Sequence, residues 1–281
     1  MLEIMGPQNS DAWLRARCGR VTGSKLADVC DFVFKGSAAR GDKAVLHGSK
    51  RKLYWRACLG ERLTGQLANH WYSEYMARGE QEEEPARMFY ESVTRQMVVP
   101  VSFVVHPEFP WTGASADGLI GSDGVLEIKN PSTEKHLLYW EEGVVPEDYV
   151  PQCAWEMASA GKARRFADFL SFDRRIQDPT LCYFLKRTGR DELEWDIPVL
   201  MDGKGEYRKL TGEAVIDYFT EQAVAFNSEI EAFLAEHNAK PIAPFPVEFQ
   251  EEKEPDAGYD ASKPFAGQDF GFLDNTLADV P

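Results

Sequence analysis

The sequence predicts an α/β protein in which one central mixed β-sheet is flanked by α-helices and followed by an extended acidic tail. Apolar residues recur at helical spacing before residue 95 and again between residues 132 and 160, while short alternating runs lie between and after these segments. This order of elements is typical of a single sheet covered by helices. Prolines at 241, 244 and 246, followed by a polar and acidic stretch, indicate a tail that packs no core.

Three helical segments are expected before the first strands. Residues 11–33 form an N-terminal helical segment, residues 42–64 form a helix that ends before Gly65, and residues 72–95 form another helix. Gly65 fits a helix end because glycine adopts the left-handed conformation without steric cost. Residues 36–41 are rich in small residues and predict a flexible loop.

Strands and further helices follow. Alternating and β-branched residues predict strands at 97–106, 111–121, 125–129, 165–172, 181–186 and 193–200. Helices are expected at 132–142, 147–160 and 206–237. Pro151 suits a first helical turn, because that position needs no amide hydrogen. We therefore expect one folded domain over residues 1–240 and a separate acidic tail over residues 241–281.

The strand pair at 111–121 and 125–129 carries charged groups where an apolar hairpin is expected. Asp123-Gly124 is typical of a tight hairpin turn, since both positions tolerate positive φ. The period-two alternation of the second strand places Glu127 and Lys129 on the same face. If the hairpin folds back, Asp117 lies near Glu127, and the two carboxylates can converge on one cation.

Converging carboxylates suit Mg²⁺, which prefers oxygen ligands and usually keeps several waters. The candidate ligands are Asp117, Glu127 and the backbone carbonyl of Ile128. Lys129 could orient or deprotonate a water there, or offset charge on a phosphate. The alternative interpretation is a turn residue followed by the ordinary polar face of an edge strand, and the acid-x-Lys motif alone favours it. The Asp-Gly turn and the helix-opening segment 130–133 favour the metal site.

Four segments of the chain, in this order, share features with one nuclease family. They are Trp13 to Ser24, Gly79 to Ala86, Ser115 to Pro131 and Tyr149 to Gln152. They contain an arginine, a glycine and Thr-x-Ser, then Gly-x-x-x-Glu, then Ala-Asp-Gly and Leu-Glu-Ile-Lys-Asn-Pro, then Val-Pro-Gln. Together they resemble the phage lambda exonuclease and YqaJ-type recombinase family. The resemblance implies a PD-(D/E)XK nuclease-like core, with the central mixed sheet flanked by helices.

The resemblance also implies roles for individual positions of the hairpin and of the helix that follows it. Asp117, Glu127 and the Ile128 carbonyl become metal ligands, and Lys129 becomes the catalytic lysine. Gln152 would orient substrate or water. One departure is Ala116, which stands where the superfamily often has proline.

Three further positions gain roles from the resemblance. Glu83 would support the metal site from a helix, although neighbouring glutamates at 80, 82 and 84 leave its register open. Arg17 and Ser24 would bind the terminal 5′ phosphate of DNA. Without the resemblance, Thr22 or Ser24 is expected to cap a helix at residues 25–30. The glutamate run alone predicts a solvated helix face, and Gln152 alone predicts a surface residue.

Composition limits the class of protein. No stretch approaches the roughly 18 consecutive apolar residues of a membrane span, and residues 1–11 lack the features of a signal peptide. Five scattered cysteines without a Cys-x-x-Cys pair fit a reducing compartment and argue against zinc or an iron–sulfur cluster. The formal charge is −15, which is unusual for a DNA enzyme. Residues 248–281 carry nine of the acids and two lysines, so about half of the excess lies in the tail.

The sequence thus predicts a Mg²⁺-dependent deoxyribonuclease that uses two metal ions, with Mn²⁺ as a possible substitute. The resemblance further implies 5′-to-3′ digestion of linear double-stranded DNA to leave 3′ overhangs, a homotrimer, and a single-strand annealing protein as partner in phage recombination. The expected location is the cytoplasm of a bacterial or phage-infected cell, with no membrane partner. A restriction-type or RecB-like endonuclease and a non-catalytic DNA-binding scaffold remain the alternatives, and the partner of the tail stays open.

Overall fold

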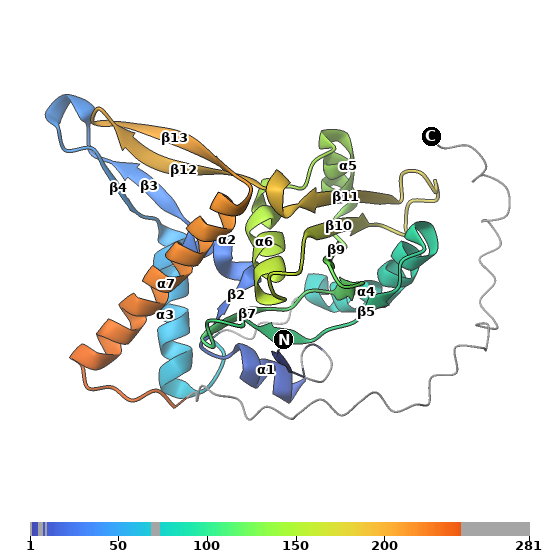
Figure 1. Ribbon diagram of the computed structural model, residues 1–281, viewed down its shortest axis with the longest axis horizontal. Coiled ribbons are helices and arrows are strands. Elements are labelled where there is room, and N and C mark those ends of the chain that lie inside the picture. The colour runs from blue at the N-terminus through green and yellow to red at the C-terminus, as the bar shows by residue number, and fades with distance from the viewer. Residues whose placement is uncertain (1, 5–7, 9, 69–73, 243–281) are drawn as a thin grey trace. The chain divides into compact units, whose positions relative to one another are not determined.

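The structure of the chain is a computed structural model that describes residues 2–4, 8, 10–68 and 74–242. The acidic tail expected over residues 241–281 therefore lies, beyond Ile242, outside the described residues. The described helices and strands all belong to one folded unit (Figure 1). None of these helices is both long and apolar enough to cross a lipid bilayer.

A five-stranded mixed sheet forms the centre of this unit. Its strand order is β11-β10-β9-β8-β5, in which β9 and β10 are parallel and the other neighbours are antiparallel. The strands are β5 (Val98–Val99), β8 (Gly118–Ile120), β9 (Gly124–Lys129), β10 (Phe166–Phe172) and β11 (Tyr183–Gly189). The crossover that a parallel pair requires is made by α5 (Thr133–Glu142) and α6 (Val150–Ser159). The predicted α/β class with a central mixed sheet is confirmed.

The two faces of this sheet are covered by different helices. Leu126 and Ile128 of β9 pack in a cluster with Ala86 and Tyr90 of α4 (Glu74–Thr94). Val125 points to the opposite face and joins a larger core that contains α6. Alternate residues of a strand share a face, so Glu127 and Lys129, like Val125, are directed toward α6.

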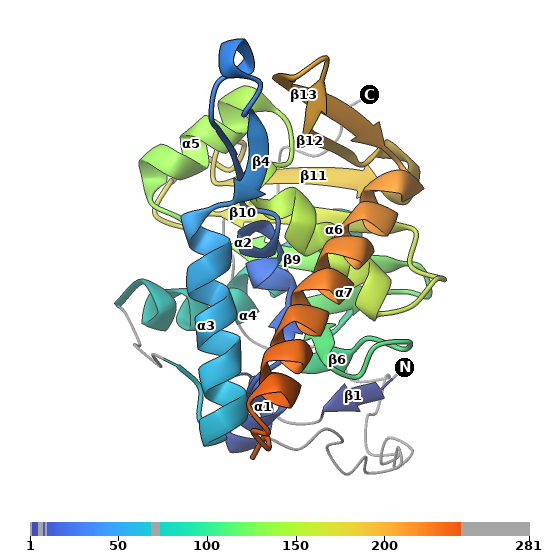
Figure 2. The ribbon, with the colours of Figure 1, turned by 90° about the vertical axis from the view of Figure 1, so that its left-hand side faces the viewer.

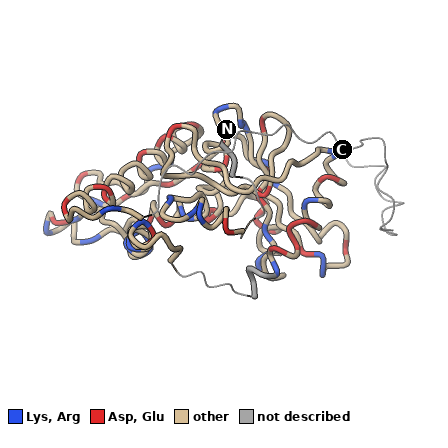
Figure 3. Tube along the Cα trace, turned by 90° about the horizontal axis from the view of Figure 1, so that it is seen from below, with Lys and Arg blue, Asp and Glu red and all other residues tan. Residues whose placement is uncertain are grey.

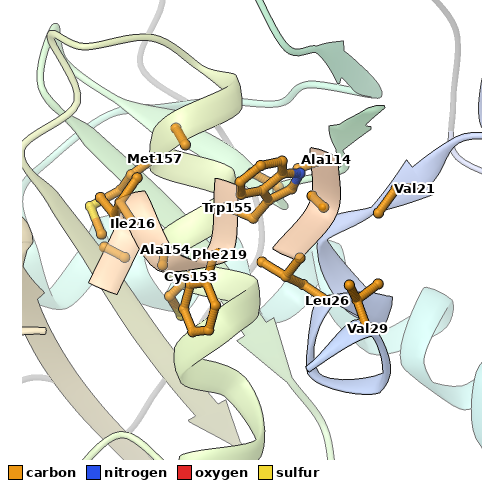
Figure 4. Close-up of a cluster of buried hydrophobic side chains, with 14 of the residues drawn as sticks. Val21, Leu26, Val29, Ala114, Cys153, Ala154, Trp155, Met157, Ile216 and Phe219 are labelled. Carbon is orange, nitrogen blue, oxygen red and sulfur yellow. The ribbon is translucent and has the colours of Figure 1, made fainter. Parts of the chain in front are cut away.

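Helix α6 lies within the larger core (Figure 4). Every residue from Pro151 to Ser159 is buried, so the helix has no solvent face. The Trp155 indole donates a 2.9 Å hydrogen bond to the Thr112 hydroxyl. On other sides the helix contacts α2 (Leu26–Val29) and α7 (Glu213–Glu236). Cys153 and Met157 are fully buried, but they are only part of the buried surface of the helix.

A second, four-stranded sheet has the order β1-β6-β7-β2 and packs with α1 (Asp11–Arg17). Its strands are β1 (Leu2–Ile4), β2 (Val21–Thr22), β6 (Phe103–Val105) and β7 (Thr112–Ala114). The continuous helical segment expected over 11–33 is therefore wrong, because strand β2 and a 3-10 turn at Gly23–Lys25 separate α1 from α2. Gly19 ends the first helical part: its φ is +70°, and a Cβ there would lie 2.7 Å from the Arg62 side chain.

Helices α3 (Ser49–Thr64) and α7 lie side by side at one end of the unit (Figures 1 and 2). Two hairpins project from the same end; the sequence predicted neither pairing, although it predicted one of the four strands, at 193–200. They are β3 (Phe32–Lys35) with β4 (Ala44–His47), and β12 (Glu194–Met201) with β13 (Lys204–Thr211). Two expected helix starts are thus wrong, since residues 44–47 and 206–211 are strands. The hairpins contact each other through the Phe34 and Tyr207 rings, whose centroids are 5.5 Å apart.

Candidate active site

The hairpin of β8 and β9 forms with a register that brings the predicted carboxylates together. Gly118 pairs with Leu126, so Asp117, one residue before β8, lies opposite Glu127. The tight Asp123-Gly124 turn is wrong in detail: the left-handed residue is Gly121, with φ of +49°, and Gly124 already belongs to β9. Gly124 is needed there because a Cβ would lie 2.3 Å from the Phe166 ring.

Backbone hydrogen bonds fix Asp117 against β9. Its amide donates to the Leu126 carbonyl at 3.0 Å, and its Oδ2 accepts from the Ile128 amide at 2.6 Å. A strand residue directs its N–H and its C=O toward the same neighbouring strand, so the Ile128 carbonyl also points to the Asp117 side. The three predicted ligand groups therefore lie together where β8 begins beside β9.

Lys129 and Gln152 both contact Glu127. The Lys129 ammonium forms an ion pair with Oε1 of Glu127, and it lies 5.1 Å from the centroid of the Tyr149 ring. The Gln152 amide donates to Oε1 of Glu127 at 2.7 Å and to Oε1 of Glu156 at 2.9 Å. Gln152 is 9% exposed, so the expectation of a surface glutamine is wrong.

Glu83 reaches the same region from α4. Its carboxylate lies 3.6 Å from the Arg87 guanidinium, which in turn donates to the Asp117 carbonyl at 3.3 Å. Its neighbours in the acidic run take other positions: Glu82 forms an ion pair with Arg174 at 2.7 Å, and Glu80 and Glu84 are exposed. The geometry thus favours Glu83 over these neighbours as the glutamate that faces the carboxylate pair.

The electrostatics of this cluster reflect excess negative charge. Burial, and then the charges of Glu127 and Glu83, raise the pKa of Asp117 well above its usual value. Burial and Glu127 also raise the pKa of Glu156. Burial lowers the pKa of Lys129, but Glu127 and Asp117 outweigh it and hold that pKa above its usual value. The two carboxylates thus favour the charged form of Lys129.

The residues of the cluster fit a divalent cation. Oε2 of Glu127 is buried without an amide, hydroxyl or cationic donor among the described residues, and such an oxygen is costly unless a proton on the neighbouring Glu156 carboxyl or a bound cation neutralises it. Two carboxylates and a backbone carbonyl are hard oxygen ligands of the kind that Mg²⁺ takes together with waters. The part of the chain that the structure describes holds no group of three or more His, Cys, Asp or Glu side chains placed to bind a metal ion. A cation bound here would need the carbonyl, waters and substrate to complete its coordination.

Arg17 and Ser24 also meet, and Arg17 contacts Ser115, which stands two residues before Asp117 in the chain. The Arg17 guanidinium donates to the Ser24 hydroxyl at 3.4 Å and to the Ser115 hydroxyl at 3.3 Å, and it stacks 4.4 Å from the centroid of the Trp13 ring. The expected helix cap is wrong, because neither Thr22 nor Lys25 makes a side-chain cap bond and Ser24 lies within the 3-10 turn. The guanidinium is instead held in place by an aromatic ring and two hydroxyls.

Two residues near the site were not singled out from the sequence. Ser115 connects Arg17 to the strand that leads to Asp117, and it accepts a 3.0 Å hydrogen bond from the Trp13 indole. Glu156 lies one turn after Gln152 on α6 and shares its amide with Glu127. The i, i+4 spacing of Gln152 and Glu156 was the available signal, but it requires knowledge that this face of α6 is buried. A cavity of about 1070 Å³ elsewhere, lined by residues such as Val145, Lys186 and Trp195, includes none of these groups.

Comparisons with known proteins agree with this geometry. The family model of the YqaJ-like viral recombinase domain matches residues 12–163, more than half of the chain. Two solved structures of an alkaline exonuclease (LHK-Exo) from Laribacter hongkongensis, one of them in complex with dAMP, are similar in fold. Each is 28% identical, with a TM-score of 0.64, over 82% of this chain and 96% of that chain. A search of curated proteins finds no match. The chain therefore belongs to the YqaJ-like viral recombinase family, as its sequence motifs suggested.

Proposed function

We propose that the chain is a magnesium-dependent exonuclease that digests linear double-stranded DNA from 5′ to 3′ and leaves 3′ single-stranded overhangs for recombination. Its family and its fold make it a deoxyribonuclease of the phage exonuclease type. To this the proposal adds three features: the magnesium ion, the 5′-to-3′ direction of digestion and the 3′ overhang that remains. They are supported by the family resemblance of the matched residues and by the arrangement of charged groups at the site.

One observation carries the proposal: Asp117 lies opposite Glu127, and the Lys129 ammonium contacts Glu127. Asp117, Glu127 and the Ile128 carbonyl would hold the cation. A divalent ion bound there supplies Lewis acidity to the attacking water and to the scissile phosphate. A second ion would also fit the proposal if phosphate oxygens of the substrate complete its coordination.

The chain's own residues divide the remaining tasks. Lys129 offsets negative charge that develops on the phosphate in the transition state. Gln152 holds Glu127 in place through its 2.7 Å hydrogen bond, and its position allows it to orient substrate or water. Glu83 would support the bound metal from α4.

In the proposal, Arg17 sets the 5′-to-3′ direction of digestion by binding the 5′ phosphate. A guanidinium binds a terminal phosphate through two parallel hydrogen bonds, and such bonds to charged groups are about twice as strong as neutral ones. Arg17 and Ser24 lie beside Ser115, two residues before Asp117 in the chain. A 5′ phosphate bound there would place a following phosphodiester near the carboxylates.

The assembly is the last part of the proposal. The family resemblance favours a homotrimer that encloses the duplex and a single-strand annealing protein as its partner. Sedimentation of the purified chain with and without duplex DNA tests the trimer, and co-purification with an annealing protein tests the second partner. A monomer that digests long duplexes processively would contradict the enclosing ring.

The decisive experiment uses linear duplexes that carry a label on either strand and a 5′ phosphate or a 5′ hydroxyl. With Mg²⁺, we expect release of mononucleotides from 5′-phosphorylated ends, and no release in EDTA. The variants Asp117→Asn, Glu127→Gln and Lys129→Met should lose this activity while remaining folded. The matched control Glu84→Gln removes an exposed acid of the neighbouring run and should keep it. Linearisation of closed circular plasmid would instead identify an endonuclease.

A further inference from the structure

A small basic pocket lies at the start of α3, where this helix faces α7. It has a volume of about 140 Å³ and is lined by six residues: His47, Arg51, Lys52, Trp55, Arg56 and Glu229. Taken at roughly 30 Å³ for each water, this volume corresponds to about five water molecules. The pocket therefore accepts a group of a few heavy atoms. Its residues belong to β4, α3 and α7, and none of them belongs to the proposed catalytic cluster.

Two of the lining residues carry a buried nitrogen donor that lacks an acceptor within the described part of the chain. Arg51 is 1% exposed; it donates from Nη1 to the Val29 carbonyl and from Nη2 to Glu229, but its Nε is buried without a partner. The indole Nε1 of Trp55, one turn later, is also buried without a partner. An unmade hydrogen bond at a buried donor costs about 1–3 kcal/mol. Two such donors at one pocket indicate a missing acceptor.

The charge at the pocket is positive in a chain that is strongly acidic. Arg51, Lys52 and Arg56 supply three cations, and Glu229 supplies one acid that is already bonded to Arg51 at 2.7 Å. Lys52 and Arg56 are exposed at its mouth. Lys and Arg (blue) and Asp and Glu (red) are both spread over much of the trace (Figure 3). The pocket thus carries three basic side chains and one acidic side chain in a chain whose net charge is −15.

We propose that this pocket binds a phosphate group, distinct from the 5′-phosphate site at Arg17. The oxygens of a tetrahedral phosphate accept hydrogen bonds from Arg51 Nε and Trp55 Nε1, and Lys52 and Arg56 neutralise its charge. The phosphate comes either from the backbone of duplex DNA that the protein holds or from free phosphate in solution. Glu229, which also lines the pocket, holds Arg51 in position through their 2.7 Å ion pair.

The test uses the exposed cations, because Arg51 also supports the fold. Three variants of the full-length protein are compared: Lys52→Gln/Arg56→Gln, Trp55→Phe, and the control Lys50→Gln, which changes an exposed lysine of the same helix outside the pocket. Binding of inorganic phosphate is followed by calorimetry, and thermal unfolding confirms that each variant is folded. We expect the double variant to lose about tenfold or more in phosphate affinity, Trp55→Phe to lose affinity in the same direction, and the control to match the wild type.

The source of the phosphate is decided by duplex binding as a function of salt, with metal omitted to prevent digestion. If the DNA backbone occupies the pocket, the slope of log K against log salt falls by about 0.9 in the double variant and is unchanged in the control. If phosphate binds but this slope is unchanged, the ligand is free phosphate. If the wild type binds no phosphate and the double variant has the wild-type slope, the proposal is wrong.

Discussion

Replacing Asp117 by asparagine is expected to stabilise the metal-free protein. In the wild type, burial and the charges of Glu127 and Glu83 raise the pKa of Asp117, so ionised Asp117 is disfavoured in the folded state. Asparagine keeps the shape and an acceptor for the Ile128 amide, which now donates to Asp117 at 2.6 Å. The substitution removes the negative charge that the carboxylates of Glu127 and Glu83 repel.

The sign of the pH dependence follows from linkage. A carboxyl whose pKa is raised by folding binds its proton more tightly when folded, so stability falls as pH rises above the unfolded pKa of about 3.9. Each unit of difference costs about 1.4 kcal/mol once pH exceeds the folded pKa. From the usual cost of a poorly compensated buried polar group, we expect Asp117→Asn to gain about 2 kcal/mol at pH 7.5, and nothing near pH 4.

The assay is urea and thermal unfolding in EDTA at several pH values. For a chain of this size, about 2 kcal/mol corresponds to an increase in Tm of roughly 4–8 °C. Asp217→Asn, which changes an exposed aspartate on α7, is the control and should stay within about 0.5 kcal/mol of the wild type. A less stable Asp117→Asn at pH 7.5, or a gain that does not shrink toward pH 4, would refute the repulsion argument.

Three further predictions concern the groups around the carboxylates. Arg17→Gln should lower the preference for 5′-phosphorylated over 5′-hydroxyl ends by about tenfold or more, measured as kcat/KM on both substrates, because it removes a charged donor next to Ser24 and Ser115. Glu156→Gln should lower kcat and leave KM for DNA unchanged, because it alters the side chain that accepts the 2.9 Å hydrogen bond from Gln152. A rise in KM as large as the fall in kcat would contradict this. Gly124→Val should destabilise the fold by about 3 kcal/mol in urea unfolding, because its Cβ would lie 2.3 Å from Phe166; wild-type stability would contradict the packing.

The sequence predicted the part of the site that lies on one hairpin. Alternation along β9 and a turn of the right length are enough to place Asp117 opposite Glu127, whichever glycine takes the positive φ. Arg17 and Ser24 were paired through the family resemblance, and the structure places them within 3.4 Å of each other. The helix cap expected there was wrong because a 3-10 turn follows strand β2 directly.

The unpredicted parts have two physical causes. Strand β13 pairs with β12 and has polar and charged residues on both faces, so its sequence lacks the alternation that marks a strand with one buried face. Gln152 and Glu156 are polar residues on a helix without a solvent face, and helical periodicity cannot reveal this. Their burial depends on α2, α7 and the sheet, which surround α6 only after the chain has folded.

Anomalous diffraction from crystals grown with Mn²⁺ in place of Mg²⁺ tests the central claim most directly. We expect a peak at ligand distance from Asp117 and Glu127 and on the side of the Ile128 carbonyl, and its absence in crystals of Asp117→Asn. A wild-type crystal whose only Mn²⁺ lies away from both carboxylates, in a preparation that digests DNA, would contradict the proposed site.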